Sequence, residues 1–458
     1  MRVMKFGGTS VGTVASLRNV KKIVEEAATE PVIVVVSALG GVTDLLLRAA
    51  REACACNREW QQTYDLIVSR HHDVVFSELV ALERQQEVWS GVEILLKRLK
   101  DYYTGIELLE DFSDRTQCNV VSMGERMSSF IISHIIKDAR LFYSPDFIKT
   151  EKWFDKNIAA TPLTDRLICD TFRDFAGPVA IAPGFISTDA ATGDITNLGR
   201  GGSDYTAALL AASLGAQVLD IWTDVDGFMT ADPRIIKDAE VIPHLSFLES
   251  MDLCNFGAKV IYPPTIYPVF HKNIPIRILN TFNPSAPGTL ITDEHHDVTD
   301  HTFRGVTSIA ATSLITAAPD SRFPLPELHS RVLNVLSKQG VEILLTSAAS
   351  PTSPLKLAVR ATDAPRALRA LREDFAPELS EGTSPVFTER EDVSTISVVG
   401  ENIKLHPDIS LKLLGALNGA GIDVPASATG ASGFTFSMLV NADRHQDALR
   451  TLHALIFH

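Results

Sequence analysis

The sequence has few cysteines, and their spacing fits neither a disulfide framework nor a metal site. Five cysteines, an odd number, occur in 458 residues. They are Cys54, Cys56, Cys118, Cys169 and Cys254. Cys54 and Cys56 form a lone C-x-C with no second pair at zinc spacing, so we interpret them as two small residues on a helix. A reduced, cytoplasmic setting fits this cysteine usage.

Long apolar runs and a positive charge balance are also lacking. No apolar run is long enough to span a bilayer, and the N-terminus runs directly into an expected strand, so we expect no signal peptide. The 42 Lys and Arg residues against 56 Asp and Glu residues give a formal net charge of −14. This balance disfavours nucleic acid or an anionic membrane as the main partner, and a phosphorylated ligand would need a local basic pocket.

The remaining composition is that of an ordinary globular protein with more than one domain. Hydrophobic residues make up 45% and charged residues 21% of the chain. A chain of 458 residues exceeds the usual size of one core, so two or three domains are expected.

The most informative stretch is NLGRGGSDYTAALLAASLG, at positions 197–215. It opens with three glycines, a cation and two candidate helix caps: Gly199, Arg200, Gly201, Gly202, Ser203 and Asp204. Glycines let a ligand approach the backbone, and the N–H groups at a helix start attract phosphate or carboxylate. Arg200 adds a planar fork suited to either anion. The alternative is a tight turn with a surface arginine.

A second glycine loop follows the first expected strand. Residues 2–6 are expected to form that strand, Gly7 and Gly8 a tight loop, and residues 17–28 a helix, which together make a phosphate-binding start. The arrangement is not a P-loop, because Lys5 precedes the glycines. Lys5 can place its ammonium on the β- and γ-phosphates of a nucleotide. The alternative is an ordinary edge lysine.

Other expected strands also end in polar loops. The apolar run 31–36 predicts a buried parallel strand, and the hydroxyl- and glycine-rich loop 37–44 follows it at the carboxyl end, where ligands sit in open α/β sheets. The stretch 120–126 is interpreted as a strand-to-helix junction, at which Glu125 either caps the helix or holds a cation. Residues 179–185 form another strand that runs into a loop.

The stretch 223–234 is turn-rich. Its Asp-x-Asp-Gly fragment lacks the later ligands of a calcium loop, so we interpret the stretch as a nucleotide lid with Asp224 at a strand end and Arg234 available to phosphate. Lys259 is a second lysine near a glycine. Residues 275–279 are expected to form the last strand of this region. The acidic stretch 293–301 is interpreted as a linker, although its three histidines leave a metal as the alternative.

The last third of the chain contains a faint internal repeat, in which LNVLSKQGVEIL resembles LGALNGAGIDVP and PRALRALREDF resembles QDALRTLHALIF. The first copy is expected to have strands at 313–317, 341–346 and 355–359 and helices ending at 339 and covering 364–375. The second is expected to have strands at 395–399, 422–425 and 434–440 and helices at 408–418 and 444–455. Two βαββαβ units fit this pattern. Neither clusters catalytic groups, so we expect binding or regulation, with dimerisation as the alternative.

Taken together, the motifs resemble the aspartokinase branch of the amino-acid kinase family. The match runs through KFGGTS at 5–10, SA at 37–38 with Thr43, SMGE at 122–125, LGRGGSDYTA at 198–207, WTDVDG at 222–227, DPR at 232–234 and FGAKV at 256–260. The repeat resembles the paired ACT domains of that family. The chain ends after the pair, so we expect the homoserine dehydrogenase domain of some relatives to be absent.

The resemblance implies an α/β fold with an open, parallel-rich sheet between helices, followed by two α+β ferredoxin-like ACT units. It places the catalytic domain at 1–292, a linker at 293–302, a first ACT unit at 303–390, whose first strand can join the second unit, and the second at 391–458. It also implies a homodimer or higher homo-oligomer, with no nucleic acid or membrane partner.

The implied activity is ATP-dependent phosphorylation of the β-carboxylate of L-aspartate to 4-phospho-L-aspartate. This is the first step of the pathway to lysine, threonine and methionine, regulated through the ACT units. ATP and the Mg²⁺ that it carries are the implied cofactors, and no protein-bound metal is expected.

The resemblance also implies roles for single residues. Lys5 would stabilise charge on the moving phosphoryl group, and Asp204 would orient Lys5 or the substrate amine. Arg200 would clamp a substrate carboxylate and Glu125 would hold the α-ammonium. Thr43 and Ser203 complete the implied substrate contacts. The implied ATP contacts are Lys5, Phe6, Gly7, Gly8, Thr223, Asp224, Met229, Arg234, Lys259 and Val260.

Two departures from the family pattern concern the ligands. Met229 stands where relatives usually carry a tyrosine near the adenine, which affects nucleotide preference. Ser347 and Thr429 stand where feedback-sensitive relatives carry glutamine in each ACT unit, so we expect inhibition by lysine or threonine to be weakened, altered or lost.

Three other functions compete with this interpretation. Another amino-acid kinase, such as an acetylglutamate or glutamate kinase, would share the fold, but the KFGGTS start and the ACT pair favour aspartate. A catalytically silent amino-acid sensor would lack ATP turnover. A dinucleotide-binding dehydrogenase is disfavoured, because no G-x-G-x-x-G follows the first strand.

Overall fold

A computed structural model describes residues 1–153, 156–293, 303–318, 325–348, 353–380, 385–401, 403, 408–430 and 433–457. The chain divides into two compact units that alternate along the sequence. The first contains Met1–Phe228 and Val260–Glu294, and the second contains Met229–Lys259 and His295–His458. The predicted domain boundaries stay a prediction. Apart from Asp293, the predicted linker lies outside the described residues, and so do its three histidines.

The first unit is built on a parallel-rich sheet with the strand order β12-β11-β9-β1-β2-β6-β3. Its strands are β1 (Arg2–Phe6), β2 (Val32–Val36), β3 (Ala139–Leu141), β6 (Val179–Pro183), β9 (Leu219–Thr223), β11 (Ile276–Asn280) and β12 (Thr289–Thr292). Neighbouring strands are parallel except for β11 and β12. All five residues of β2 are buried, because helices cover both faces of the sheet.

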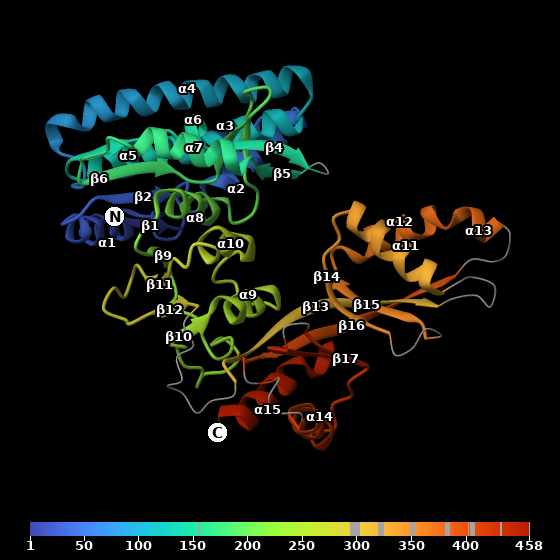
Figure 1. Ribbon diagram of the computed structural model, residues 1–458. Coiled ribbons are helices and arrows are strands. Elements are labelled where there is room, and N and C mark those ends of the chain that lie inside the picture. Colours follow the sequence, from blue (N-terminus) through green and yellow to red (C-terminus); the bar gives the residue numbers. More distant parts are fainter. Residues whose placement is uncertain are drawn as a thin grey trace. The chain divides into compact units, whose positions relative to one another are not determined.

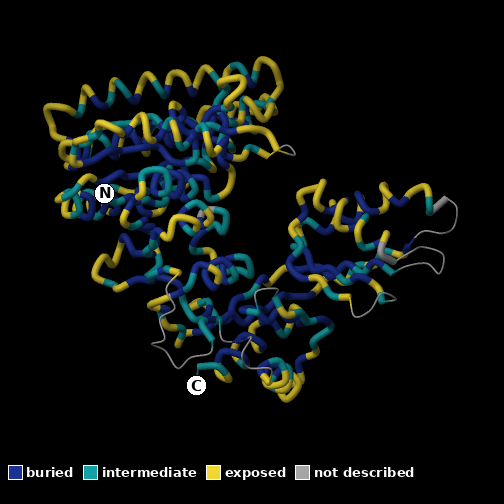
Figure 2. The backbone as a smooth tube through the Cα atoms, in the orientation of Figure 1, coloured by how far each residue is buried: buried dark blue, intermediate teal, exposed yellow. Residues whose placement is uncertain are grey.

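Helices form a layer on each face of this sheet (Figure 1). The helices of the unit are α1 (Val14–Ala27), α2 (Val42–Cys54), α3 (Glu59–Val75), α4 (Gln85–Leu109), α5 (Asp114–Ile135), α6 (Ser144–Phe147), α7 (Thr161–Phe172), α8 (Gly202–Leu214) and α10 (Ile266–Phe270), with short 3₁₀ turns at Leu82–Arg84 and Pro263–Thr265. One core joins alternate residues of β1, β2 and β6 to α1 through α5. Helix α8 contacts β1, β2 and β9 and also α7 and α10. Figure 2 shows the outer turns of α4 exposed and the strands buried.

A small mixed sheet lies beside this layer, with the strand order β5-β4-β7-β8. Its strands are β4 (Lys149–Trp153), β5 (Lys156–Ala159), β7 (Ile186–Asp189) and β8 (Ile195–Asn197). Strands β7 and β8 form an antiparallel pair, in which Ile186 is opposite Asn197. This pair carries the chain from the end of β6 to the glycine loop before α8.

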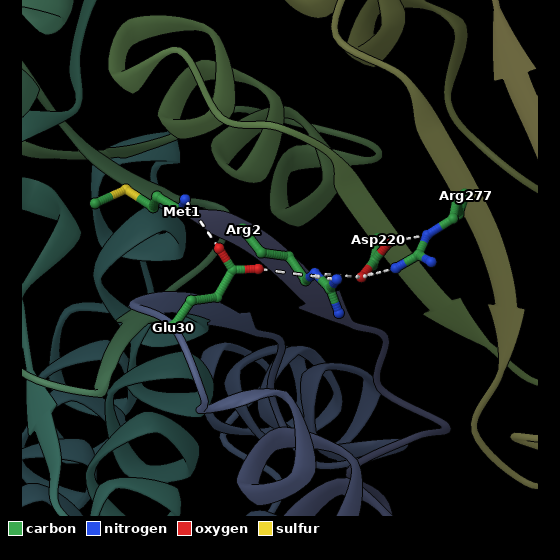
Figure 3. A network of polar contacts seen from close by, with 5 residues as sticks. All are labelled: Met1, Arg2, Glu30, Asp220 and Arg277. Atoms are coloured by element: carbon green, nitrogen blue, oxygen red, sulfur yellow. Dashed lines mark hydrogen bonds and ion pairs between the residues drawn. The ribbon is translucent and has the colours of Figure 1, made fainter.

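An ion network ties the amino-terminal ends of the central parallel strands together (Figure 3). Asp220 of β9 is completely buried, and both of its carboxylate oxygens accept a hydrogen bond of 2.7 Å from the guanidinium of Arg277. Arg2 lies 3.7 Å from the same carboxylate and 3.9 Å from Glu30, which also pairs with the amine of Met1 at 3.3 Å. Two guanidinium groups thus compensate one buried carboxylate at the end of the sheet opposite Lys5.

The second unit contains one antiparallel sheet made by the two sequence repeats, with the order β14-β15-β13-β16-β18-β17. The first copy consists of β13 (Gly305–Ala318), α11 (Leu325–Lys338), β14 (Ile343–Ser347), β15 (Leu355–Arg360), α12 (Ala364–Asp374) and α13 (Ala376–Ser380). The second consists of β16 (Val386–Val399), α14 (Ile409–Gly419), β17 (Ala426–Thr429), β18 (Thr435–Asn441), a 3₁₀ turn (Ala442–Arg444) and α15 (His445–Phe457).

Each copy has its own apolar core, and β13 contributes to both. Ile315 and Ala317 pack in the core with α11 and α12, whereas Val306 packs in the core with α14 and α15. The register of β13 against β16 shifts between Ile309 and Thr312, where the strand passes from one core to the other. This β-bulge lets one strand serve two packed layers.

The segment Met229–Lys259 packs with the C-terminal sheet, within the second unit. It contains β10 (His244–Ser246) and α9 (Phe247–Asn255). Ala231 and Ile236 lie in the same apolar core as α14 and α15. Glu249 of α9 is buried and accepts a hydrogen bond of 3.2 Å from Nε of Arg304. The segment is therefore part of the C-terminal unit by both apolar and polar contacts.

Two predicted elements were wrong. Residues 120–126 are not a strand-to-helix junction, because α5 starts at Asp114 after the N-cap Ser113 and runs through them. Residues 422–425 form no strand, and the strand of that region starts at Ala426. In the part of the chain that the structure describes, no helix combines the length and the apolar character needed to cross a membrane.

Candidate active site

A cavity of about 290 Å³ lies where the carboxyl ends of β1, β2 and β6 meet the start of α8. Its lining comes from the predicted catalytic and substrate residues, three glycines of the loop and two further residues: Lys5, Ser37, Thr43, Glu125, Phe185, Gly199, Arg200, Gly201, Gly202, Ser203 and Asp204. The structure therefore brings Lys5, Thr43 and Glu125 to the glycine loop, although they are far from it in the sequence.

The start of α8 differs from the prediction in its cap. Neither Ser203 nor Asp204 caps the helix; Gly201, with φ of 68°, occupies the N-cap position. A Cβ atom on Gly201 would lie 2.2 Å from Cβ of Tyr262, so glycine is required here by both its φ and the space. No described residue accepts a hydrogen bond from the backbone N–H of Ser203 or Asp204. These two donors at a helix start form a site for an anion.

Lys5 and Asp204 form an ion pair inside the cavity. Lys5 Nζ lies 2.5 Å from Asp204 Oδ1, and the two side chains are only 11% and 12% exposed. Lys5 is placed by β1 and Asp204 by the first turn of α8, which packs on that strand. The pair holds the ammonium at a fixed position, from which it can act on a phosphate at the glycine loop of Gly7 and Gly8.

Arg200 supplies a second cation, and no described carboxylate pairs with it. Its position in the loop is exposed, and it lines the cavity together with Gly199 and Gly201. A guanidinium without a partner at the mouth of a cavity can bind a carboxylate or phosphate in a bidentate manner.

Glu125 provides a second acidic group of the cavity, besides Asp204, from the middle of α5. It is 4% exposed, and its Oε1 accepts a hydrogen bond of 3.2 Å from the backbone N–H of Ala38. Its other oxygen is buried without a hydrogen-bond partner. Burial raises the pKa of Glu125 to about 8, and the hydrogen bond from Ala38 opposes this shift. A cation that reaches this oxygen would satisfy it and favour the ionised form.

The residues that sequence reasoning left out of the site are Ser37 and Phe185. The hydroxyls of Ser37 and Ser203 lie 3.0 Å apart, and Ser128 donates to the carbonyl of Ser37 over 2.7 Å. Phe185 has φ of 69°, which is unusual for a residue with a side chain. Ser37 directly follows β2 and Phe185 lies two residues after β6, so both lie at the carboxyl ends of parallel strands, and this position was the signal that could have identified them.

The predicted nucleotide residues fall into two groups. Seven of them belong to the first unit and lie in or directly after β1 and β9, or at residue 260, where the chain returns to this unit: Lys5, Phe6, Gly7, Gly8, Thr223, Asp224 and Val260. Phe6 is completely buried and stacks on Trp222 with centroids 5.9 Å apart, so its side chain packs in the core. Asp224 is exposed, and its carboxylate accepts a hydrogen bond of 3.3 Å from the hydroxyl of Thr223.

The other three, Met229, Arg234 and Lys259, belong to the second unit. Arg234 is 82% exposed and pairs with Asp232 at 2.7 Å, so its guanidinium is held by a neighbouring carboxylate. The predicted effector residues are also in this unit: Ser347 is the last residue of β14 and Thr429 the last of β17. β14 and β17 are the first and last strands in the order of the sheet, and yet residues of the two strands contact each other.

The sequence model of a protein family, described as the amino acid kinase family, matches residues 1–280 of this chain. The chain belongs to the amino acid kinase family. A model described as an ACT domain matches residues 396–455. Both agree with the predicted fold class, which the structure confirms.

Curated relatives of this chain include aspartokinases. The bifunctional aspartokinase/homoserine dehydrogenase of Haemophilus influenzae is 30% identical over 472 residues, covering 100% of this chain and 56% of the relative. The chain thus spans about half the length of the first curated relatives it matches. Aspartokinase 2, chloroplastic, of Arabidopsis thaliana is 28% identical, with 99% of this chain and 84% of the relative covered.

Solved structures show a likeness over the whole chain as well. E. coli aspartokinase III in complex with aspartate and ADP is 25% identical, with a TM-score of 0.86 and full coverage of both chains. The same enzyme in complex with lysine and aspartate is 26% identical, with a TM-score of 0.77.

Proposed function

We propose that the protein transfers the terminal phosphate of ATP to the β-carboxylate of L-aspartate, giving 4-phospho-L-aspartate. The observation that carries this proposal is the charge pattern of one cavity. Arg200 offers a free guanidinium, Glu125 an unpaired carboxylate oxygen, and Lys5 an ammonium beside a glycine loop. An amino acid with a second carboxylate has groups that complement Arg200 and Glu125. The neighbouring E. coli structure holds aspartate and ADP, which supports the same pair of ligands here.

The chemistry required is mainly alignment and charge neutralisation. A carboxylate is already a nucleophile, so no strong base is needed, and the negative charge of the transferring phosphoryl group must be stabilised. Lys5 is suited to this role, because its partner Asp204 fixes its position. Mg²⁺ carried by the phosphates of ATP supplies further positive charge. The free N–H groups at the start of α8 can hold a substrate carboxylate or a phosphate oxygen.

Substrate recognition rests on two opposite charges. Arg200 would bind a carboxylate of aspartate, and Glu125 would bind its α-ammonium through the unpaired oxygen. The hydroxyls of Thr43 and Ser203 would complete these contacts from two further elements. Because Glu125 favours the protonated form in the free protein, aspartate binding would release a proton.

The test is an ATP-dependent assay in which hydroxylamine traps the acyl phosphate as a hydroxamate. We expect the wild-type protein to form aspartyl hydroxamate. Arg200→Ala should raise KM for aspartate by about 50-fold with little change in KM for ATP, because a charge-assisted bidentate contact to the amino acid is lost. Arg166→Ala, at an exposed position of α7, is the matched control. An equal rise in both KM values would contradict the assignment of Arg200.

Substrates other than aspartate decide the rival functions. Hydroxamate from glutamate or acetylglutamate in place of aspartate would identify a different amino acid kinase. An absence of ATP turnover with all these acids would leave an amino-acid sensor as the function.

Regulation and assembly are part of the same proposal. The relative bound to lysine and aspartate supports an amino-acid effector for this chain, with Ser347 and Thr429 at the predicted effector positions. Because hydroxyls are shorter than the glutamine amides of sensitive relatives, we expect weak inhibition by lysine or threonine. Strong inhibition at sub-millimolar concentration would contradict this expectation. Sedimentation velocity tests the proposed homodimer or higher homo-oligomer. The small, odd number of cysteines, five in 458 residues, supports the proposed cytoplasmic setting.

A further inference from the structure

Asn197 connects the Arg200 loop to the helix that carries Glu125. It is the last residue of β8, and its Oδ1 accepts a hydrogen bond of 3.0 Å from the backbone N–H of Gly199. Its Nδ2 donates to Sγ of Cys118 on α5 over 3.2 Å. Since Oδ1 must face an N–H donor, the orientation of the amide is fixed and Nδ2 faces the sulfur.

Cys118 and Glu125 lie on one face of α5. They are seven residues apart, which is about two helical turns and about 10 Å along the helix axis. This face contacts β8. Burial raises the pKa of the Cys118 thiol, so the sulfur is a neutral group at this contact. A displacement of Asn197 along the helix therefore changes the separation between the Arg200 loop and Glu125.

Among the described residues, few other backbone hydrogen bonds hold the glycine loop around Arg200. Leu198 donates its backbone N–H to the carbonyl of Phe185 over 2.9 Å, Gly202 donates to Gly199 over 3.0 Å, and Tyr205 of α8 donates to Gly201 over 2.9 Å. Gly199 has φ of 71° and open space around its Cβ position. Without the side chain of Asn197, the backbone at Gly199 would lose the hydrogen-bonded link to α5 that runs through Cys118. The carbonyl of Asn197 accepts a further bond of 3.4 Å from Asn157.

We propose that Asn197 is a positioning residue, which holds the Arg200 loop against α5 through Cys118 and so sets the span between the guanidinium of Arg200 and the carboxylate of Glu125. This inference rests on the proposed function. In that function the two groups bind a carboxylate and the ammonium of one amino acid, so their span determines the length of the acid that fits. Asn197 touches neither substrate nor nucleotide in this scheme.

The test compares the two substrates of the reaction in Asn197→Ala. We expect KM for aspartate to rise about ten-fold, KM for ATP to stay within about two-fold, and the preference for aspartate over the longer glutamate to fall. A merely structural role would move both KM values together. Asn119→Ala is the matched control, because the amide of Asn119 bonds to Arg115 of its own helix and not to the loop.

Substitutions of Cys118 test the same contact from the side of α5, without changing any residue of the glycine loop. Cys118→Ala removes the acceptor and should raise KM for aspartate about three-fold, whereas Cys118→Ser, which keeps an acceptor, should restore it. In Asn197→Ala the further change Cys118→Ala should have no additional effect, because the two residues act through one contact.

The outcomes separate this inference from the function on which it rests. An active wild-type protein whose KM for aspartate is unchanged in both Asn197→Ala and Cys118→Ala overturns the inference and leaves the function standing. Equal rises in the two KM values, or additive effects in the double variant, also overturn it. A wild-type protein that forms no acyl phosphate from aspartate overturns both.

Discussion

The buried carboxyl group of Glu125 should make the first unit less stable as pH rises. The pKa of Glu125 is about 8 in the folded protein and 4.5 in the unfolded chain. Between these values the unfolded chain binds fewer protons than the folded protein, so the free energy of unfolding falls with increasing pH. The loss begins near pH 4.5 and is complete above about pH 8. At 1.36 kcal/mol per unit, the full effect is about 5 kcal/mol.

Glu125→Gln removes this titration and keeps an oxygen for the N–H of Ala38. The buried amide of glutamine has an unpaired N–H₂ group, which costs about 1–3 kcal/mol at every pH. The difference in unfolding free energy between variant and wild type should therefore change by about 4 kcal/mol in favour of the variant from pH 5 to pH 8. Glu93→Gln, at an exposed position of α4, is the control and should show no such change.

The assay can follow the first unit alone. All four tryptophans are in it: Trp60, Trp89, Trp153 and Trp222. Urea unfolding followed by tryptophan fluorescence at pH 5, 6, 7 and 8 gives the required free energies without mixing in the second unit. Parallel pH curves for the wild type and Glu125→Gln would refute the reasoning, because they would show that the carboxyl group does not titrate in this range.

Three other changes test separate parts of the fold and site. Asp220→Ala removes a buried carboxylate and leaves its arginine unpaired, so it should destabilise the first unit by about 3 kcal/mol in the same urea assay without changing KM; a changed KM at unchanged stability would contradict this. Gly201→Ala puts a Cβ against Tyr262 and should lower kcat/KM for aspartate at least about ten-fold in the hydroxamate assay, whereas Gly215→Ala, with open space, should not. Lys5→Met should lower kcat about 10³-fold with KM for aspartate retained; a loss below ten-fold would remove Lys5 from the phosphoryl-transfer step.

The parallel strands and their loops could be predicted because their signals are local. The run VIVVV of β2 is apolar throughout, since both faces of the strand are covered. The glycines near Arg200 indicated a ligand loop, and the structure brings this loop to Lys5 and Glu125. The carboxyl-end rule for parallel sheets explains why residues so far apart in the sequence meet.

The errors arose where tertiary contacts override local signals. The stretch 120–126 was interpreted as a strand-to-helix junction, but it lies inside α5, where a Cβ on Gly124 would lie 2.8 Å from Cβ of Ala38, so the glycine permits close packing of a continuous helix. Ser203 suggested a cap, but its hydroxyl lies at 3.0 Å from that of Ser37 on another loop. Neither partner can be read from the neighbouring sequence.

The position of Met229–Lys259 has a consequence for any attempt to separate the two halves of the chain. A fragment that stops at residue 292 would keep this segment but lose the C-terminal sheet, leaving Ala231 and Ile236 without the side chains that cover them. Burial of apolar residues is a main source of stability, so the fragment would be less stable and would expose an apolar surface that promotes aggregation. Chimeras with relatives face the same obstacle. In such a chimera the exchanged unit must be joined between Phe228 and Met229 and between Lys259 and Val260 as well as in the predicted linker. This is because the chain passes from one unit to the other more than once.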